Sequence, residues 1–148
     1  YFYNYLKQPW KCQEKVRYIM DTFYGNKPDA LSGNDDCGQM SAWYIFNTMG
    51  FYPTAPSSNV YNLGSPGLAA VDMKMSNGKH LRMTTGNWSA RNVFVKEVYL
   101  NGKKYDKSYI TYNDIKDGAD LHFVMSSRPN YKRGVAERAV PPSVSEKR

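Results

Sequence analysis

The chain has 148 residues, of which 41% are apolar and 15% aromatic, and its formal net charge is +7. This composition is typical of a globular protein rather than a disordered one, and the length suits one domain or two small halves. No run of about 18 apolar residues occurs, so we expect no helix that spans a membrane. The two cysteines, Cys12 and Cys37, do not have the paired spacing of a zinc site.

The positive charge is concentrated near the end of the sequence. Residues 128–148 contain six basic and two acidic residues, so this segment carries four of the seven excess charges. We interpret residues 128–148 as a basic tail and expect it to be flexible. No segment has the aromatic pattern of an RNA-recognition sheet, and the charge is explained by a solvated surface, so we expect no nucleic-acid partner.

Two helices are predicted in the first third of the chain. Apolar residues between Val16 and Phe23 follow the spacing of one helical face, and Pro9 suits the first turn of a helix over residues 9–23. A second helix is predicted over residues 38–49, with Gly50 closing it. This second helix is apolar on more than one face, so we expect it to pack inside something larger than a pair of helices.

The pattern after Pro56 is that of short strands and turns. Strands are predicted over residues 69–75, 81–84, 93–100, 103–105 and 120–125, with Asn-Gly turns at residues 77–78 and 101–102 and a helical turn within residues 111–118. The strand over residues 93–100 mixes polar and apolar residues on both faces, so the sequence does not tell which face is buried. We therefore predict an α+β chain, with the helices in residues 1–56 and a β segment in residues 57–127.

Two adjacent carboxylates, Asp35 and Asp36, stand in the stretch from Gly33 to Trp43, just before the second helix. Ordinary helix capping explains one of them, because a carboxylate accepts hydrogen bonds from the free amides and suits the helix dipole. A second carboxylate next to it costs repulsion. Two interpretations stay open: capping alone, or a site in which an ionised carboxylate acts as a general base or electrostatic stabiliser.

The run from Gly33 to Trp43, with Gly50-Phe51-Tyr52-Pro53 and Gly64-Ser65-Pro66 after it, closely resembles the C-terminal part of glycoside hydrolase family 92. The shorter segments Pro9-Trp10-Lys11, Pro28-Asp29-Ala30-Leu31, Asn101-Gly102-Lys103 and Met125-Ser126-Ser127 match the family in the same register. The resemblance covers residues 1 to about 134. It implies that residues 1–56 are the end of an (α/α)6 catalytic barrel, followed by an antiparallel C-terminal β segment, and we expect the chain to be a fragment of a longer polypeptide.

The resemblance also implies an activity. Members of the family are calcium-dependent, exo-acting α-mannosidases that invert the anomeric centre, with an acid and a base about 6.5–9.5 Å apart. The family's general base lies in this loop and matches Asp36, with Asp35 as a helper. The general acid is a glutamate from an earlier stretch, so we expect it outside this chain. The expected substrates are terminal α-mannosides, α-1,2-linked, as in N-glycan degradation.

Further residues are expected to take part in binding. Asn34 and Trp10 are the candidates for substrate contacts, Trp10 only if the two helices place it beside the acidic loop. Calcium needs six to eight oxygens, and the chain offers only a partial set in residues 29 and 34–36, so no metal ligand is assigned. The family suggests a periplasmic or secreted location.

Some alternatives remain open. Trp43 lies inside the second helix, and we expect it to belong to the core rather than to a sugar site. A disulfide between Cys12 and Cys37 is possible. The alternative function, from a different class, is a non-catalytic carbohydrate-binding or structural β module.

Overall fold

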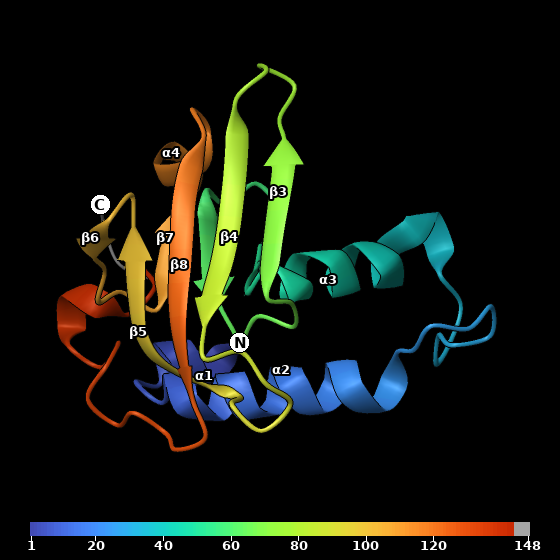
Figure 1. Cartoon of the computed structure of the whole chain (residues 1–148), viewed down its shortest axis with the longest axis horizontal. Helices are drawn as coiled ribbons and strands as arrows, with labels where there is room; N and C mark the ends of the chain where they lie inside the picture. The colour runs from blue at the N-terminus through green and yellow to red at the C-terminus, as the bar shows by residue number, and fades with distance from the viewer. Residues whose placement is uncertain (144–148) are drawn as a thin grey trace.

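The computed structural model describes residues 1–143. The chain begins with α1 (Phe2–Tyr5) and α2 (Pro9–Phe23). A loop leads from α2 to a single 3₁₀ turn, η1 (Asp36–Gly38), and to α3 (Gln39–Thr48), which runs back toward the strands (Figure 1). The predicted first helix is confirmed with its bounds, and the second begins one residue later than expected.

Two sheets follow the helices. The smaller sheet has the order β1-β2-β7, with β1 (Phe51–Tyr52), β2 (Val60–Leu63) and β7 (Tyr109–Thr111). The larger sheet has the order β3-β4-β8-β5-β6, with β3 (Ala70–Lys74), β4 (His80–Gly86), β8 (Ala119–Ser126), β5 (Phe94–Leu100) and β6 (Lys103–Lys104). The short helix α4 (Tyr112–Ile115) follows β7, and η2 (Glu137–Ala139) lies in the last described segment.

The predicted α+β class is confirmed, but the β segment is not purely antiparallel. Strand β8 lies between β4 and β5, and it pairs antiparallel with β5 and parallel with β4. The parallel pair arises because the chain returns to the middle of the sheet, by way of β7 and α4, instead of adding a strand at its edge. In the described part of the chain, no helix is long and apolar enough to cross a membrane.

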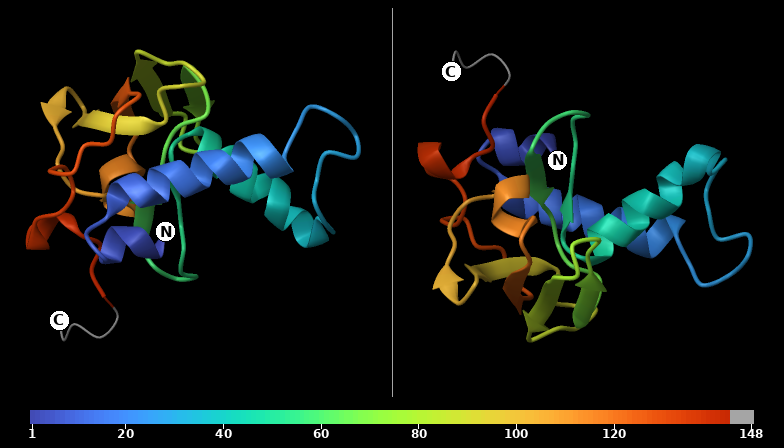
Figure 2. Two further views of the ribbon diagram at one scale, coloured as in Figure 1. Left: turned by 90° about the horizontal axis from the view of Figure 1, so that it is seen from below. Right: turned by 90° about the horizontal axis from the view of Figure 1, so that it is seen from above.

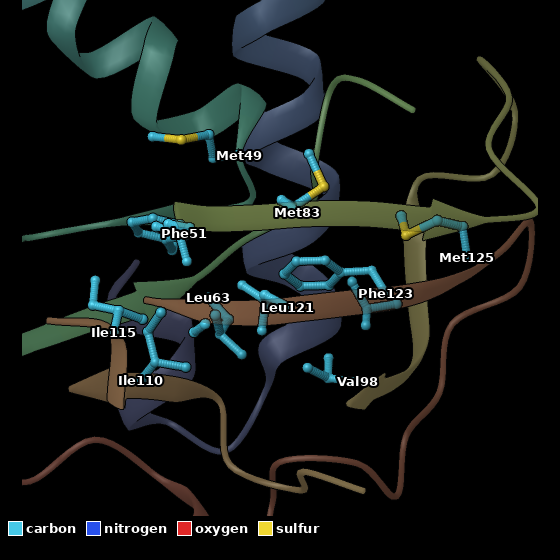
Figure 3. Packing of buried hydrophobic residues seen from close by; sticks show 13 residues of the cluster. Met49, Phe51, Leu63, Met83, Val98, Ile110, Ile115, Leu121, Phe123 and Met125 are labelled. Carbon is cyan, nitrogen blue, oxygen red and sulfur yellow. The ribbon is translucent and has the colours of Figure 1, made fainter. Parts of the chain in front are cut away.

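The main core lies between the two sheets (Figure 3). Phe51 and Leu63 from the smaller sheet face Leu121 and Phe123 from the larger one, and Met49 closes the core from the end of α3. Each of these side chains is at most 4% exposed. Because burying apolar surface is the dominant favourable contribution to folding, this core is what joins α3 to both sheets.

A second, smaller core attaches α2 to the rest of the molecule. It consists of Cys12, Val16 and Met20, with Trp43 packed against them. Trp43 therefore packs against the core, as expected, but it is only partly buried. The buried Gln13 also accepts a hydrogen bond from the backbone N–H of Val95 at 3.0 Å, which ties α2 to β5.

Strand β5 contains a β-bulge, which explains why its sequence showed mixed faces. Val95 pairs with Met125 and Glu97 pairs with Val124, so Lys96 is the extra residue that has no partner across the strand. The bulge resets the alternation, so Val95 and Val98 are both buried although they are three residues apart.

The expectation of a flexible tail is wrong for its described part, residues 128–143. Arg133 is only 7% exposed and donates from Nη2 to the carbonyl oxygens of Tyr105 and Lys107, at 3.3 and 2.8 Å. The carbonyl of Ala139 accepts from the backbone N–H of Ser108 at 2.7 Å. The segment follows the β5 and β6 side of the molecule (Figures 1 and 2) because these buried hydrogen bonds hold it there. Residues 144–148 lie outside the described residues.

Candidate active site

The candidate site is the acidic loop, which we define as residues 33–38, at the start of α3. Two consecutive residues here have positive φ, Cys37 at 57° and Gly38 at 72°. Two left-handed residues in succession turn the chain sharply from η1 into α3. The acidic loop therefore presents its side chains at the N-terminal end of α3, at the end of the molecule opposite to the start of α2 (Figure 1).

Asp35 is bound tightly into this turn. Its Oδ1 accepts from the backbone N–H groups of Met40 and Ser41, at 2.8 and 3.0 Å, and its Oδ2 accepts from the Ser41 hydroxyl at 2.6 Å. The hydrogen bond from the Ser41 hydroxyl, followed by the one from the Ser41 N–H, holds the pKa of Asp35 below its usual value. Asp35 thus caps α3, as the structural interpretation of the acidic pair required.

Asp36 is placed differently from its neighbour. It is exposed, and its carboxylate has no hydrogen-bond or ion-pair partner within residues 1–143. Asn34, on the other side of Asp35, is also exposed. The two carboxylates therefore have separate roles in the geometry: Asp35 fixes the loop, and Asp36 keeps its lone pairs open to solvent.

An aromatic group next to the acidic loop was not predicted from the sequence. The ring of Tyr24 stacks on those of Trp43 and Tyr44, with ring centroids 5.3 and 4.9 Å apart and interplanar angles of 18°. Burial, and next the charge of Asp35, raise the pKa of Tyr24. The sequence feature that could have predicted this group is the position of Tyr24, one residue beyond the end of α2, where a loop residue can reach the start of α3.

Trp10 is not brought to the acidic loop. It lies in the first turn of α2, whereas the loop follows the last turn, about 20 Å away along the helix axis. Its ring meets Tyr131 edge-on, with centroids 5.0 Å apart. The start of α2 lies against the last described segment instead, with Pro9 near Gly134, so Trp10 does not meet the condition under which it was a candidate for a substrate contact.

Residues 1–143 do not form a complete catalytic or metal site on their own. No group of three or more histidine, cysteine, aspartate or glutamate side chains in this range could hold a metal ion, and both oxygens of Asp35 are already engaged. Within residues 1–143, the carboxylates of the acidic loop therefore do not form a calcium site by themselves. Glu14 is on the exposed side of α2, and Glu97 accepts from Tyr99 and Lys104, which lower its pKa. Neither is placed as an acid opposite Asp36.

The two cysteines are not bonded to each other. Cys12 is buried in the small core under α2, and Cys37 is exposed in the acidic loop. The disulfide that the sequence allowed between Cys12 and Cys37 is therefore not formed.

Comparisons with known proteins identify the class as a glycosidase domain. The glycosyl hydrolase family 92 catalytic domain matches residues 1–127. A family GH92 α-mannosidase from Bacteroides thetaiotaomicron is 68% identical to the chain, with a TM-score of 0.95, and it is also solved in complex with mannoimidazole. A GH92 inverting mannosidase from Bacteroides thetaiotaomicron VPI-5482 is 35% identical, with a TM-score of 0.90. An uncharacterized secreted glycosidase from Arthroderma benhamiae is 26% identical over 147 residues.

The chain belongs to glycoside hydrolase family 92. These alignments cover 97% of the chain but only 19–20% of the relatives' own length, so the chain spans about a fifth of the proteins that it matches. The family expected from the acidic loop and its neighbouring segments is confirmed.

Proposed function

We propose that this chain is the part of a family 92 α-mannosidase that supplies the general base, and that Asp36 is that base. The observation that supports this role is the difference between the two carboxylates. Both carboxylate oxygens of Asp35 accept hydrogen bonds at the start of α3. The Asp36 carboxylate, one residue further on, is exposed and has no hydrogen-bond partner among the described residues. A general base needs a carboxylate that is free to accept a hydrogen bond from a water molecule, and of the two carboxylates in this pair only Asp36 is without hydrogen bonds among residues 1–143.

The reaction assigned to this site is hydrolysis of terminal α-mannosides with inversion. Asp36 removes a proton from a water molecule, which attacks the anomeric carbon from the face opposite to the leaving oxygen. Asp35 keeps the loop in place, and we assign to Asn34, which is exposed beside it, a contact with the sugar. One relative carries the description of an inverting mannosidase, which supports inversion here. An α-1,2 linkage, within N-glycans, is the specific substrate that we propose.

The rest of the site would come from a longer polypeptide. We propose that the general acid, most calcium ligands and the partners of α3 lie there, because the matched relatives are about five times longer than this chain. The exposed apolar residues of α3 agree with this, since Ile45 is 58% and Tyr44 38% exposed. The secreted relative supports an extracytoplasmic location.

The test is made in the parent polypeptide with an aryl α-mannoside as substrate. Asp36→Asn is expected to lower kcat by about 10²–10⁴-fold with little change in KM, because it removes proton transfer and leaves the loop intact. Asp117→Asn, an exposed carboxylate in the β half, is the matched control and should keep wild-type turnover. Proton NMR of the first product should show β-mannose.

Three results would contradict the proposal. Wild-type kcat in Asp36→Asn would exclude Asp36 as the base, and α-mannose as the first product would exclude inversion. Clear turnover by the 148-residue chain alone would show that the acid is inside it. If the parent polypeptide bound mannosides but hydrolysed none, the non-catalytic carbohydrate-binding module would be the better interpretation.

A further inference from the structure

The last described segment and strand β5 line a cleft. Both lie at the end of the molecule opposite to the acidic loop (Figure 1). Two adjoining cavities, of about 210 and 340 Å³, share Lys96, Asn130 and Lys132 in their walls. We call the two cavities together the basic cleft. The proposed base at Asp36 does not involve these residues.

The smaller cavity is lined by four cationic and two acidic side chains, which gives it a formal charge of +2. Its acidic residues are Glu97 and Asp106, and Glu97 is already engaged by Lys104 at 3.3 Å and by the Tyr99 hydroxyl at 2.8 Å. The ammonium groups of Lys96 and Lys132 have no ion-pair partner within residues 1–143. Two cations are therefore free to bind an anion at the mouth of this cavity.

A buried arginine lies in the same wall. Arg133 is 7% exposed, and although its Nη2 donates to two carbonyl oxygens, its Nε and Nη1 have no hydrogen-bond partner among the described residues. Burial lowers the pKa of Arg133 to about 10, so it stays charged at neutral pH, and Asp106 faces it without forming an ion pair within 4.0 Å. A buried and incompletely paired cation is unfavourable unless negative charge approaches it. Its nitrogens are covered by protein atoms, so Arg133 attracts an anion through its charge, and the lysines make the contacts.

Hydrogen bonds fix the backbone at the two free lysines. Lys96 is the bulged residue of β5, and its carbonyl oxygen accepts from Asn130 Nδ2 at 2.9 Å. Asn130 Oδ1 in turn accepts from the backbone N–H of Lys132 at 3.0 Å. One asparagine therefore ties both lysine-bearing segments together, so ligand binding has to order the two lysine side chains but not the backbone that carries them.

The larger cavity has an aromatic side. Tyr131 lines it and is 63% exposed, and Trp10 supports the tyrosine ring edge-on with centroids 5.0 Å apart. The exposed ring of Tyr131, held in place by Trp10 and next to the lysines of the basic cleft, suits a ligand that has both an apolar ring face and an anionic group.

We propose that the basic cleft binds an anionic saccharide, with its phosphate, sulfate or carboxylate group between Lys96 and Lys132 and its sugar ring against Tyr131. The smaller cavity has the liquid volume of about seven water molecules, which is enough for such a group. That the sugar is a mannose rests on the proposed function. The anion site itself does not, because it is at the other end of the molecule from Asp36.

Calorimetric titration of the 148-residue chain at constant ionic strength tests the proposal, with mannose 6-phosphate, inorganic phosphate and mannose as probes. Mannose 6-phosphate should bind most tightly, phosphate more weakly, and mannose without measurable heat. The double variant Lys96→Ala/Lys132→Ala should weaken binding of both phosphates by about tenfold or more. The control Lys74→Ala/Lys79→Ala removes the same charge at the β3–β4 turn and should bind as the wild type does.

The sugar half of the proposal has its own test. Tyr131→Ala should weaken mannose 6-phosphate and leave inorganic phosphate unchanged, and Tyr131→Phe should restore the wild-type affinity. Mannose 6-sulfate and glucuronate, titrated in parallel, show which anionic group is preferred. Asp36→Asn should bind like the wild type, so a failure of the proposed catalysis does not affect this measurement.

Four results would overturn the proposal. The first is that no anionic sugar binds, and the second is that the Lys74/Lys79 control loses as much affinity as the Lys96/Lys132 variant. The third is that inorganic phosphate binds as tightly as mannose 6-phosphate, and the fourth is that a short oligonucleotide binds more tightly than the sugar phosphate. The second and fourth would mean general electrostatic attraction, and the third an anion site without a sugar site.

Discussion

Gly50, which follows α3, is a position where a single added carbon should disturb the main core. Its φ is +88°, and a Cβ there would lie 2.9 Å from Cζ and 3.2 Å from Cε2 of Phe123 and 3.2 Å from Cδ of Pro66. Phe123 is completely buried between the sheets, so its ring has little room to move away (Figure 3). Gly78 offers a matched control, because its φ is +79° and nothing lies within 4 Å of its Cβ position.

The two alanine substitutions share one cost and differ in the other. An L-residue in the left-handed region costs about 1–2 kcal/mol, and this applies to both positions. Only Gly50→Ala also overpacks the core, which adds about 1–3 kcal/mol. We therefore expect Gly50→Ala to lower the free energy of unfolding by about 2–5 kcal/mol, and Gly78→Ala by about 1–2 kcal/mol.

Urea denaturation followed by tryptophan fluorescence measures both differences. The midpoint should fall further for Gly50→Ala than for Gly78→Ala, with the slope m unchanged if both variants unfold in two states. An equal loss in the two variants would refute the reasoning, since it would show that Phe123 yields to the new methyl group and that only the backbone conformation matters.

Three further predictions concern the acidic loop, the cysteines and the buried asparagine of α1. Asp35→Asn should destabilise the chain at neutral pH. Because hydrogen bonds lower the folded-state pKa of Asp35, the difference in stability between wild type and variant should shrink as the pH falls below about 4. Thermal melts across this pH range measure that difference. Cys37 should react with a thiol reagent in the native chain, whereas Cys12, whose pKa burial raises to about 11, should react only on unfolding, as absorbance would show. Asn4→Ala should lower the free energy of unfolding in urea by about 1–3 kcal/mol. The reason is that Asn4 is fully buried and its Nδ2 donates to Asn62 Oδ1 and to the carbonyl oxygens of Leu63 and Ser108.

Each of these predictions has an outcome that contradicts it. A pH-independent difference between wild type and Asp35→Asn would mean that its hydrogen bonds are not what holds the loop. Equal labelling rates for Cys12 and Cys37 would show that the core under α2 opens readily. Wild-type stability in Asn4→Ala would mean that water replaces the lost donor.

Local sequence was sufficient for α2, α3 and the hairpin turns, but α1 was not predicted. The apolar spacing of α2 and the glycine after α3 act within a few residues, and so do the Asn-Gly turns at residues 77–78 and 101–102. The acidic pair before α3 could also be located from sequence, because the matching run from Gly33 to Trp43 is continuous. The role of Asp36 itself stays a prediction until it is tested.

The strands of the smaller sheet could not be predicted in this way. β1, β2 and β7 have two to four residues each, and β7 reaches β2 across about 50 residues of chain. Asn62 in β2 would argue against a buried strand, but the distant Asn4 donates to its Oδ1 at 3.2 Å. A buried hydrogen bond of this kind, between residues far apart in sequence, can be recognised only when the position of the partner residue is known.

The sequence by itself determined the family, the two main helices and the presence of an acidic pair before α3. Only the tertiary structure decided that Asp35 caps the helix while Asp36 stays free, that Trp10 lies far from both, and that residues 128–143 pack against β5 and β6. The physical reason is that periodicity and turn residues act over a few positions along the chain. Which carboxylate is bonded, and which surface a basic segment covers, depends on hydrogen bonds between residues that are distant in sequence.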